Sequence, residues 1–452
     1  AQLPEDIYEE PVSSEFNFPM GLTFDADGRM YVWEKAGKVR IMDTTGLILP
    51  DPLIDISEEI MNWKDHGLTG FALHPDFLSN GYFYLLYAAD LHYLKFYGSP
   101  AYHPDSMTTN TATIGRVARY QADPSTGFST VIEGSRKLLL GESIENGIPL
   151  LYAFHGLGSL IIGTDNTLLI SCGDATSNGG PDTGGDSIGT FVTPALEEGI
   201  LTPDQDIGSY KSQYLGSYSG KILRIDPETG DGLPSNPFFD PANSRSPQSR
   251  TWALGFRNPY RIVLKPNSGS HYPDEGNPGI IIVGDVGNGA WEELNIIRHG
   301  GQNFGWPVME GNGLMWAFYT KEVPENQQAP NPLFGTGCDQ EFFTFRDLLL
   351  RPKKDQEPVF SNPCDATQEI PASAFPMEES LATIVWNNSK WNPPARAIIP
   401  GFGEDGGVIS REIIETESGV EGENFEGYSS LAGVFYTSHT YPEEYHNTYF
   451  AV

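Results

Sequence analysis

The chain has 452 residues, which exceeds the usual size of one domain, although all-β propellers and barrels reach this length as single units. Its 60 acidic residues outnumber the 27 lysines and arginines and give a formal net charge of -33, which argues against nucleic acid or an anionic membrane as a partner. No apolar run is long enough to cross a membrane, so the sequence predicts no membrane span.

The first ten residues, AQLPEDIYEE, contain neither a basic patch nor an apolar stretch. Such a beginning is typical of a mature chain from which a signal peptide has been removed. We therefore expect a secreted protein, located outside the cell or in the periplasm.

Strand signals recur along the chain as an apolar or alternating run, a turn containing Asp or Gly, and a second run. They are clearest in residues 20–43, 158–174, 261–287 and 431–452. Each module pairs its own strands but cannot bury both faces alone, so several modules must pack together. The recurrence favours a β-propeller over a β-sandwich, which the same hairpins would also allow.

Residues from about 312 to 378 are rich in Pro, Asn, Gln and Phe and have weak periodicity. This composition predicts a long insertion between blades of a single domain that spans residues 1–452. Cys338 and Cys364 both lie in loop sequence of this insertion, and we expect them to form a disulfide. Cys172, in the strand signal LLISC, is expected to pack as a small apolar residue.

Four segments of the chain carry a resemblance to a known family. They are HGLTGFALHPDFLSNGYFYLLYAA (66–89), HGLGSLIIGTDNTLLISCGDA (155–175), SGKILRIDPETGDGLPSNPFF (219–239), and WALGFRNPYRIVLKP (252–266) with GDVGNGAWEELNIIRHGGQNFGWPVMEG (284–311). In their order and spacing they resemble the soluble quinoprotein glucose and sorbosone dehydrogenases, which use pyrroloquinoline quinone (PQQ). The resemblance implies an all-β fold, a six-bladed β-propeller of four-stranded antiparallel blades. The family also includes propellers like the hedgehog-interacting proteins, to which the dehydrogenase activity does not carry over.

The resemblance implies a catalytic role for His155, which stands in a His-x-x-Gly-x-Leu turn. The matching histidine of the family is the general base, and a neutral imidazole can accept a proton near neutral pH. Without the resemblance, the residue is better interpreted as a turn histidine satisfied by backbone hydrogen bonds. Phe154 stands where the best-known members have an acidic neighbour that orients the histidine, a departure that bears on rate and pH optimum more than on mechanism.

Three further residues match positions that contact the quinone in the family. Arg257 and Asn258, in the segment LGFRNPY, match the pair that touches the cofactor, and a permanently charged guanidinium suits both its carboxylates and its reducible carbonyl. Arg257 is thereby also a predicted catalytic residue. Asp65 stands where relatives place a glutamine, and an extra carboxylate there would repel a tricarboxylate unless a cation or a proton intervenes.

The resemblance also implies calcium. Gly287 and Asn288 match a turn whose backbone carbonyls hold the ion that bridges quinone and protein, and Glu293 resembles a carboxylate of a second, structural calcium site. A solvated acidic turn is an equal alternative for Glu293. The acidic residues of the loop 173–189 offer a weaker calcium hypothesis because their spacing is not that of an EF-hand; they are Asp174, Asp182 and Asp186.

The sequence therefore predicts a secreted, PQQ- and calcium-dependent dehydrogenase that oxidises an aldose sugar at its anomeric carbon. Electrons would pass to an external acceptor such as a cytochrome or a small quinone. The alternative is a non-catalytic, calcium-stabilised propeller that acts as a binding or surface-assembly module. A calcium-dependent, lactonase-like hydrolase is a third hypothesis.

The last strand signal, in residues 431–452, matches the point where relatives begin the blade that supplies a lysine and arginines to the quinone. A ring cut there would leave an exposed strand edge, which soluble β-proteins avoid. We therefore expect either a longer native chain or a separate segment that completes the ring, with about five blades' worth of strands and an incomplete C-terminal blade.

Overall fold

The computed structural model describes residues 8, 10–289, 291–387, 397–412, 427 and 429–451. Strands dominate this part of the chain, and its α-helices have at most six residues, which confirms the predicted all-β class. The helices are α1 (Phe77–Asn80), α2 (Leu91–Phe96), α3 (Val192–Glu197), α4 (Pro247–Arg250) and α5 (Trp316–Tyr319). None of the described helices has the length and apolar character needed to cross a membrane.

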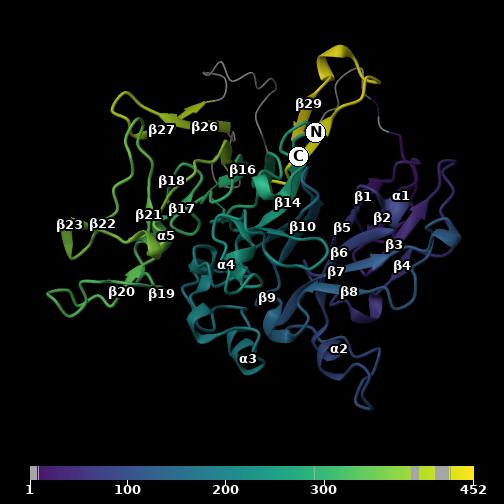
Figure 1. Ribbon diagram of the computed structural model, residues 1–452, viewed down its shortest axis with the longest axis horizontal. Helices are drawn as coiled ribbons and strands as arrows, with labels where there is room; N and C mark the ends of the chain where they lie inside the picture. The colour runs from purple at the N-terminus through teal and green to yellow at the C-terminus, as the bar shows by residue number, and fades with distance from the viewer. Residues whose placement is uncertain are drawn as a thin grey trace.

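Four large antiparallel sheets follow one another along the chain (Figure 1). The first contains β1 (Pro19–Phe24), β2 (Met30–Glu34), β3 (Lys38–Met42) and β4 (Ile54–Asp55). The second contains β5 (Leu68–Leu73), β6 (Tyr82–Ala89), β7 (Thr113–Gln121), β8 (Lys137–Leu140) and β9 (Ile148–Leu150), with β9 paired to β7. The third contains β10 (Leu157–Ile162), β11 (Leu168–Cys172), β12 (Lys221–Ile225) and β13 (Thr251–Leu254).

The fourth sheet has six strands in the order β14-β15-β16-β25-β26-β27. Their bounds are β14 (Pro259–Leu264), β15 (Ile281–Asp285), β16 (Trp291–Ile297), β25 (Ile384–Asn387), β26 (Ala397–Phe402) and β27 (Val408–Glu412). A separate hairpin follows, made of β28 (Gly433–Tyr436) and β29 (Thr448–Ala451).

The middle strands of the second, third and fourth sheets are apolar on both faces, because each of these sheets is covered on both sides. In β6, Phe83 and Leu85 belong to the core shared with the first sheet, whereas Tyr84 and Leu86 belong to the core shared with the third. Since side chains alternate along a strand, each of these runs contributes to two different cores. The third and fourth sheets share the next core, and the fourth packs against the final hairpin.

This stacking brings the first strands of successive sheets together. β1 contacts β5, β5 contacts β10, β10 contacts β14, and β14 contacts β28. A cavity of about 710 Å³ is lined by residues of β1, β5, β10 and β14 and of the segments beside them. Arg261 of β14 donates hydrogen bonds to the carbonyls of Met20 in β1 (2.9 Å) and Gly158 in β10 (3.3 Å).

Successive sheets stacked around a shared set of first strands are what the propeller prediction requires. In the part of the chain that the structure describes, β28 and β29 form a two-stranded sheet of their own. The count of six four-stranded blades, the interrupted ring and the incomplete final blade therefore remain predictions.

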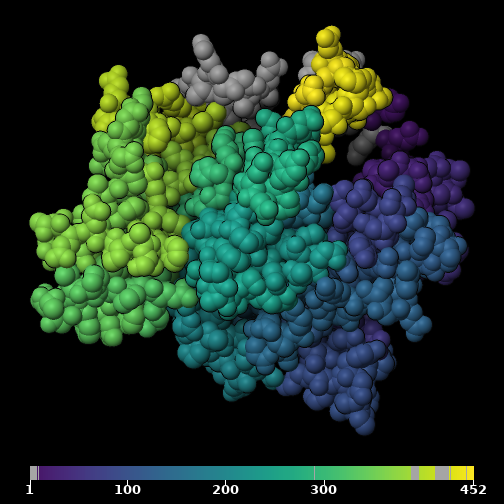
Figure 2. Space-filling view, in the orientation of Figure 1, coloured from purple at the N-terminus to yellow at the C-terminus, as the bar shows by residue number. Residues whose placement is uncertain are grey.

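The predicted insertion lies between β16 and β25, which are neighbouring strands of one sheet. The insertion therefore interrupts a sheet, whereas the sequence predicted a position between blades. The sequence could not show this, because no local pattern reveals that the short strand β25 pairs with β16. The small strands before β25 are β17 (Met309–Glu310), β18 (Gly313–Leu314), β19 (Glu325–Pro330), β20 (Phe342–Thr344), β21 (Leu349–Leu350), β22 (Ser361–Asn362), β23 (Asp365–Glu369) and β24 (Met377–Glu378). They form a lobe at one side of the molecule, green in Figure 2.

The cysteines behave as predicted. Cys338 and Cys364 form a disulfide within the insertion, with their Cα atoms 5.6 Å apart. Cys172 is free and fully buried in the core between the second and third sheets.

The ion pair of Asp165 and Arg224 in the third sheet provides a test of how this fold is stabilised. Both side chains are 0% exposed, and Arg224 Nη2 lies 2.6 Å from Asp165 Oδ2. Because removing one partner leaves an uncompensated buried charge, we expect Asp165→Asn to lower the free energy of unfolding by about 3–5 kcal/mol. Asp55→Asn, which breaks a solvent-exposed pair with Lys38, should cost less than about 1 kcal/mol. Equal losses in urea denaturation would contradict this assignment.

Candidate functional site

Four of the predicted site residues precede the first strands of the sheets. Asp65 lies shortly before β5, His155 before β10, and Arg257 and Asn258 directly before β14. Backbone hydrogen bonds join these segments, from Asp65 N to Ala153 O (3.3 Å) and from Asp174 N to Arg257 O (2.7 Å). The site therefore forms where adjacent first strands begin, and none of these four residues lines the cavity between the strands.

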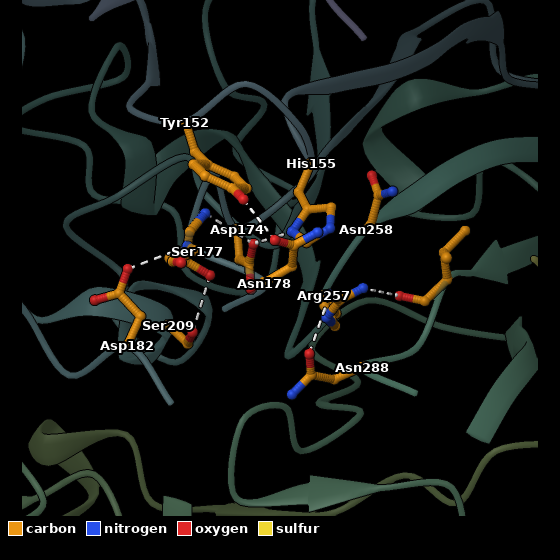
Figure 3. A network of polar contacts seen from close by, with 12 residues as sticks. Tyr152, His155, Asp174, Ser177, Asn178, Asp182, Ser209, Arg257, Asn258 and Asn288 are labelled. Atoms are coloured by element: carbon orange, nitrogen blue, oxygen red, sulfur yellow. Dashed lines mark hydrogen bonds and ion pairs between the residues drawn. The ribbon is translucent and has the colours of Figure 1, made fainter. Parts of the chain in front are cut away.

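His155 is held in a tight turn against the end of β11. Its backbone φ is 55°, and its carbonyl accepts a hydrogen bond from Ala175 N (2.9 Å). A Cβ atom at Gly173 would lie 2.3 Å from this carbonyl, so the close approach requires glycine there. The imidazole is 7% exposed, and its Nδ1 lies 3.3 Å from Oδ1 of Asp174, at an angle outside good hydrogen-bond geometry (Figure 3).

Asp174 lies beside His155, whose neighbour in the chain, Phe154, carries no carboxylate. Its Oδ1 also accepts a hydrogen bond from Thr176 N (3.1 Å), and its Oδ2 accepts one from Trp306 Nε1 (2.9 Å). From the sequence, Asp174 was expected only as a calcium ligand of the loop 173–189. The available signal was its position directly after a buried strand, but its pairing with His155 depends on the turn before β10.

The environment favours a neutral imidazole next to an ionised carboxylate. Burial, followed by the charge of Arg257, lowers the pKa of His155, and Asp174 opposes this shift. Burial by itself would raise the pKa of Asp174, but its contacts with His155 and the charge of Arg257 hold it below the usual value. At neutral pH, His155 is therefore able to accept a proton.

Arg257 is anchored at the turn that follows β15. Its Nη1 donates to the carbonyls of Val286 (2.8 Å) and Gly287 (2.7 Å), and its Nη2 donates to Oδ1 of Asn288 (3.3 Å). The guanidinium also lies 5.6 Å from the ring centre of Trp306. The structure thus brings Arg257, Gly287 and Asn288 together, and Figure 3 shows Arg257 directed toward Asn288.

Buried carboxylates cap the backbone amides around this turn. Asp285 accepts hydrogen bonds from the amides of Arg257 (3.1 Å) and Asn258 (2.6 Å), Glu292 accepts one from Gly287 (3.2 Å), and Glu310 accepts one from Asn288 (2.5 Å). Burial raises the pKa of Glu310 to about 7. Burial, and then the charge of Glu293 on the paired strand, raises the pKa of Asp285 well above its usual range.

The other predicted residues lie beside this centre. Glu293 is buried and accepts hydrogen bonds from Gly311 N (2.5 Å) and Asn295 Nδ2 (2.9 Å), so both of its oxygens have protein partners. Asp65 reaches solvent, yet surrounding protein raises the pKa of its carboxyl, an effect that Lys35 opposes. In the loop 173–189, the Asp182 carboxylate accepts from the amides of Ser177 (3.2 Å) and Gly184 (3.1 Å).

The donor set decides where a cation could bind. Within the described residues, no group of three or more His, Cys, Asp or Glu side chains has a geometry suited to a metal ion. Neutral oxygens do converge at the turn, where Val286, Gly287 and Asn288 already surround the positive charge of Arg257. Carbonyl and amide oxygens of this kind suit calcium, so the turn, rather than a carboxylate cage, fits the predicted ion.

Comparison with known proteins identifies the class to which this fold and site belong. The model of the glucose/sorbosone dehydrogenase family matches residues 16–334, and the chain belongs to this family. It is 25% identical over 329 residues to quinoprotein glucose dehydrogenase B of Acinetobacter calcoaceticus, covering 70% of this chain and 56% of that protein. It is 24% identical over 294 residues to the Hedgehog-interacting protein of Homo sapiens, covering 62% of this chain and 34% of that protein.

The chain thus spans about half or less of the length of these curated relatives. Among solved structures, it is similar to the PQQ-bound aldose sugar dehydrogenase of Streptomyces coelicolor, at 19% identity and a TM-score of 0.44. That match covers 91% of this chain and 85% of the other.

The contact between His155 and Asp174 leads to a test by pH titration. Asp174→Asn removes a charge that favours the imidazolium, so the pKa of His155 should fall further below its usual value of about 6.5. His155 then binds a proton more readily in the unfolded chain than in the folded one. Its contribution to the free energy of unfolding, which is fully present above about pH 6.5, should therefore be lost more steeply as the pH falls below that value.

Histidine-selective NMR measures this pKa directly. Asp186→Asn changes an exposed carboxylate of the same loop that bonds Thr193, and it should leave the His155 titration unchanged. A pKa of His155 that is unchanged or raised in Asp174→Asn would contradict the assigned contact.

Proposed function

We propose that this chain is a PQQ-dependent dehydrogenase that oxidises an aldose sugar at its anomeric carbon. The observation that carries the proposal is a buried imidazole, His155, paired with the ionised carboxylate of Asp174 in a chain of the glucose/sorbosone dehydrogenase family. Quinoprotein glucose dehydrogenase B, a relative by sequence, carries this chemistry in its name.

His155 is placed to remove the hydroxyl proton of the sugar. Because Nδ1 lies 3.3 Å from the Asp174 carboxylate, the ring is best assigned as the Nδ1–H tautomer, which leaves a lone pair on Nε2. Proton transfer to Nε2 creates an imidazolium, and the Asp174 carboxylate stabilises that charge. Asp174 is thus a positioning residue that acts through His155.

Bound PQQ would supply the acceptor for the hydride and release the electrons to an external acceptor such as a cytochrome or a small quinone. Among this chain's residues, Arg257 would place a permanent positive charge next to such an anionic cofactor, with Asn258 beside it. Asp65 would lie beside the same cofactor, and burial raises the pKa of its carboxyl, the direction that favours the uncharged form. Calcium would be held by oxygens of Gly287 and Asn288. Separately, we propose Glu293 as a ligand of a second, structural calcium ion.

Secretion into the extracellular space or the periplasm is also part of the proposal. It is supported by the disulfide of Cys338 and Cys364, because disulfides persist mainly in oxidising compartments.

The second candidate is a non-catalytic, calcium-stabilised binding module. Two observations favour it: the donors of Arg257 already contact the turn after β15, and one sequence relative is a Hedgehog-interacting protein. An absorption spectrum recorded after adding PQQ and calcium separates the two. The dehydrogenase requires a bound quinone that an aldose reduces, whereas a protein that leaves the quinone free or unreduced by sugars is the binding module.

Substituting His155 tests its catalytic role. In the reconstituted protein, His155→Gln should lower the turnover number by about 10²- to 10⁴-fold, the usual contribution of a general base, while PQQ binding is retained. His74→Gln is the matched control, since His74 lines the cavity between the first strands and bonds Asp76 N and Asn80 Nδ2. Sugar oxidation at the wild-type rate in His155→Gln would refute the assignment.

A further inference from the structure

The turn after β15 directs three oxygens at one positive group. The carbonyls of Val286 and Gly287 lie 2.8 and 2.7 Å from Nη1 of Arg257, and Oδ1 of Asn288 lies 3.3 Å from Nη2. Arg257 is 5% exposed, so these contacts are made largely away from solvent. Charge-assisted hydrogen bonds of this kind are stronger than neutral ones.

The orientation of the peptide groups explains why the oxygens converge. The amides of Gly287 and Asn288 donate to the buried carboxylates of Glu292 and Glu310. With these N–H groups directed at the carboxylates, the carbonyls of the turn face Arg257 instead. The carbonyl dipoles that converge on the side of Arg257 make the position attractive to a cation.

A calcium ion and the guanidinium would use the same atoms. Calcium binds oxygens at about 2.3–2.6 Å, so an ion held on the side of the Val286 and Gly287 carbonyls that faces Nη1 would overlap the guanidinium. Arginine remains charged at all physiological pH values, so the guanidinium and an ion bound elsewhere on the same oxygens would repel each other. Occupation of the turn by one cation therefore disfavours the other.

We propose that Arg257 and calcium compete for the oxygens of residues 286–288, so that calcium binding releases the Arg257 guanidinium from the turn. The released group would then be free to pair with an anionic ligand beside His155. This last consequence rests on the proposed function, whereas the competition itself does not. Calcium would take the place of the Arg257 guanidinium at the turn, and the freed guanidinium would prepare the site for a negatively charged cofactor.

Competition predicts the direction of a mutational effect. Isothermal titration of the full, quinone-free chain with calcium, at physiological ionic strength and with excess magnesium to occupy weak acidic sites, should show tighter binding to Arg257→Met than to wild type. Since a charge-assisted hydrogen bond contributes on the order of 1.5–3 kcal/mol, the loss of even one competing bond corresponds to a gain of about tenfold or more in affinity. Adding Asn288→Ala to Arg257→Met should reverse most of the gain.

The matched control is Arg261→Met. Arg261 is also an arginine bonded to backbone carbonyls, four residues along the same segment, but its partners are Met20, Gly158 and Tyr260. Loss of its charge should leave calcium affinity nearly unchanged. Comparable gains in both variants would mean that the effect is general electrostatics, and the proposal would fall.

Trp306 reports the movement of Arg257 independently of affinity. Its ring faces the guanidinium at 5.6 Å, so departure of Arg257 should shift its fluorine NMR signal in protein labelled with fluorotryptophan. Calcium should produce this shift in wild type, and Arg257→Met should show the shifted position before calcium is added. Trp306→Phe assigns the signal.

Two further outcomes would overturn the proposal. Calcium affinity equal to or weaker than wild type in Arg257→Met would mean that Arg257 supports the ion instead of competing with it. If Asn288→Ala leaves the calcium affinity unchanged in both the wild type and Arg257→Met, calcium does not bind at this turn. Neither result decides whether an aldose reduces bound quinone, so failure here is distinct from failure of the proposed function.

Discussion

The burial of the middle strands on both faces is the constraint on which the rest of this structure depends. In β6, alternate side chains enter two different cores, and β11 and β15 are divided in the same way. A sheet built from such strands is stable only when another sheet covers each face. The sheets therefore stack in chain order, and their first strands, β1, β5, β10 and β14, meet around one cavity.

The position of the site follows from that stacking. The turns before β10 and β14 are adjacent because the strands are adjacent, so His155 and Arg257 share one environment although about a hundred residues separate them. Burial of the polar groups is costly and is offset by their contacts: Asp174 accepts from Trp306 and Thr176, and Asp285 accepts from two backbone amides. The resulting centre contains a neutral imidazole and a guanidinium within a strongly acidic protein.

The contacts of Arg257 bear on both interpretations of this chain, the catalytic and the non-catalytic. A guanidinium committed to the turn stabilises the local structure and needs no cofactor, whereas the same guanidinium released from the turn is available to an anion. Glucose dehydrogenase and Hedgehog-interacting relatives share similar identity with this chain, so overall similarity does not separate the two roles. In the proposal above, the position of the Arg257 guanidinium sets the charge presented beside His155.

The features that depend on local chemistry could be predicted from the amino-acid sequence. Period-two apolar runs and Asp- and Gly-containing turns predicted an all-β chain, loop cysteines predicted the disulfide, and motif context placed His155, Arg257 and Asn258 in turns. Three contacts could be found only in the folded chain: Asp174 lies beside His155, Arg257 contacts the turn of Gly287 and Asn288, and the insertion interrupts the fourth sheet. The physical reason is range: turn and strand propensities act over a few residues, whereas these pairings join segments whose proximity is set by the packing of whole sheets.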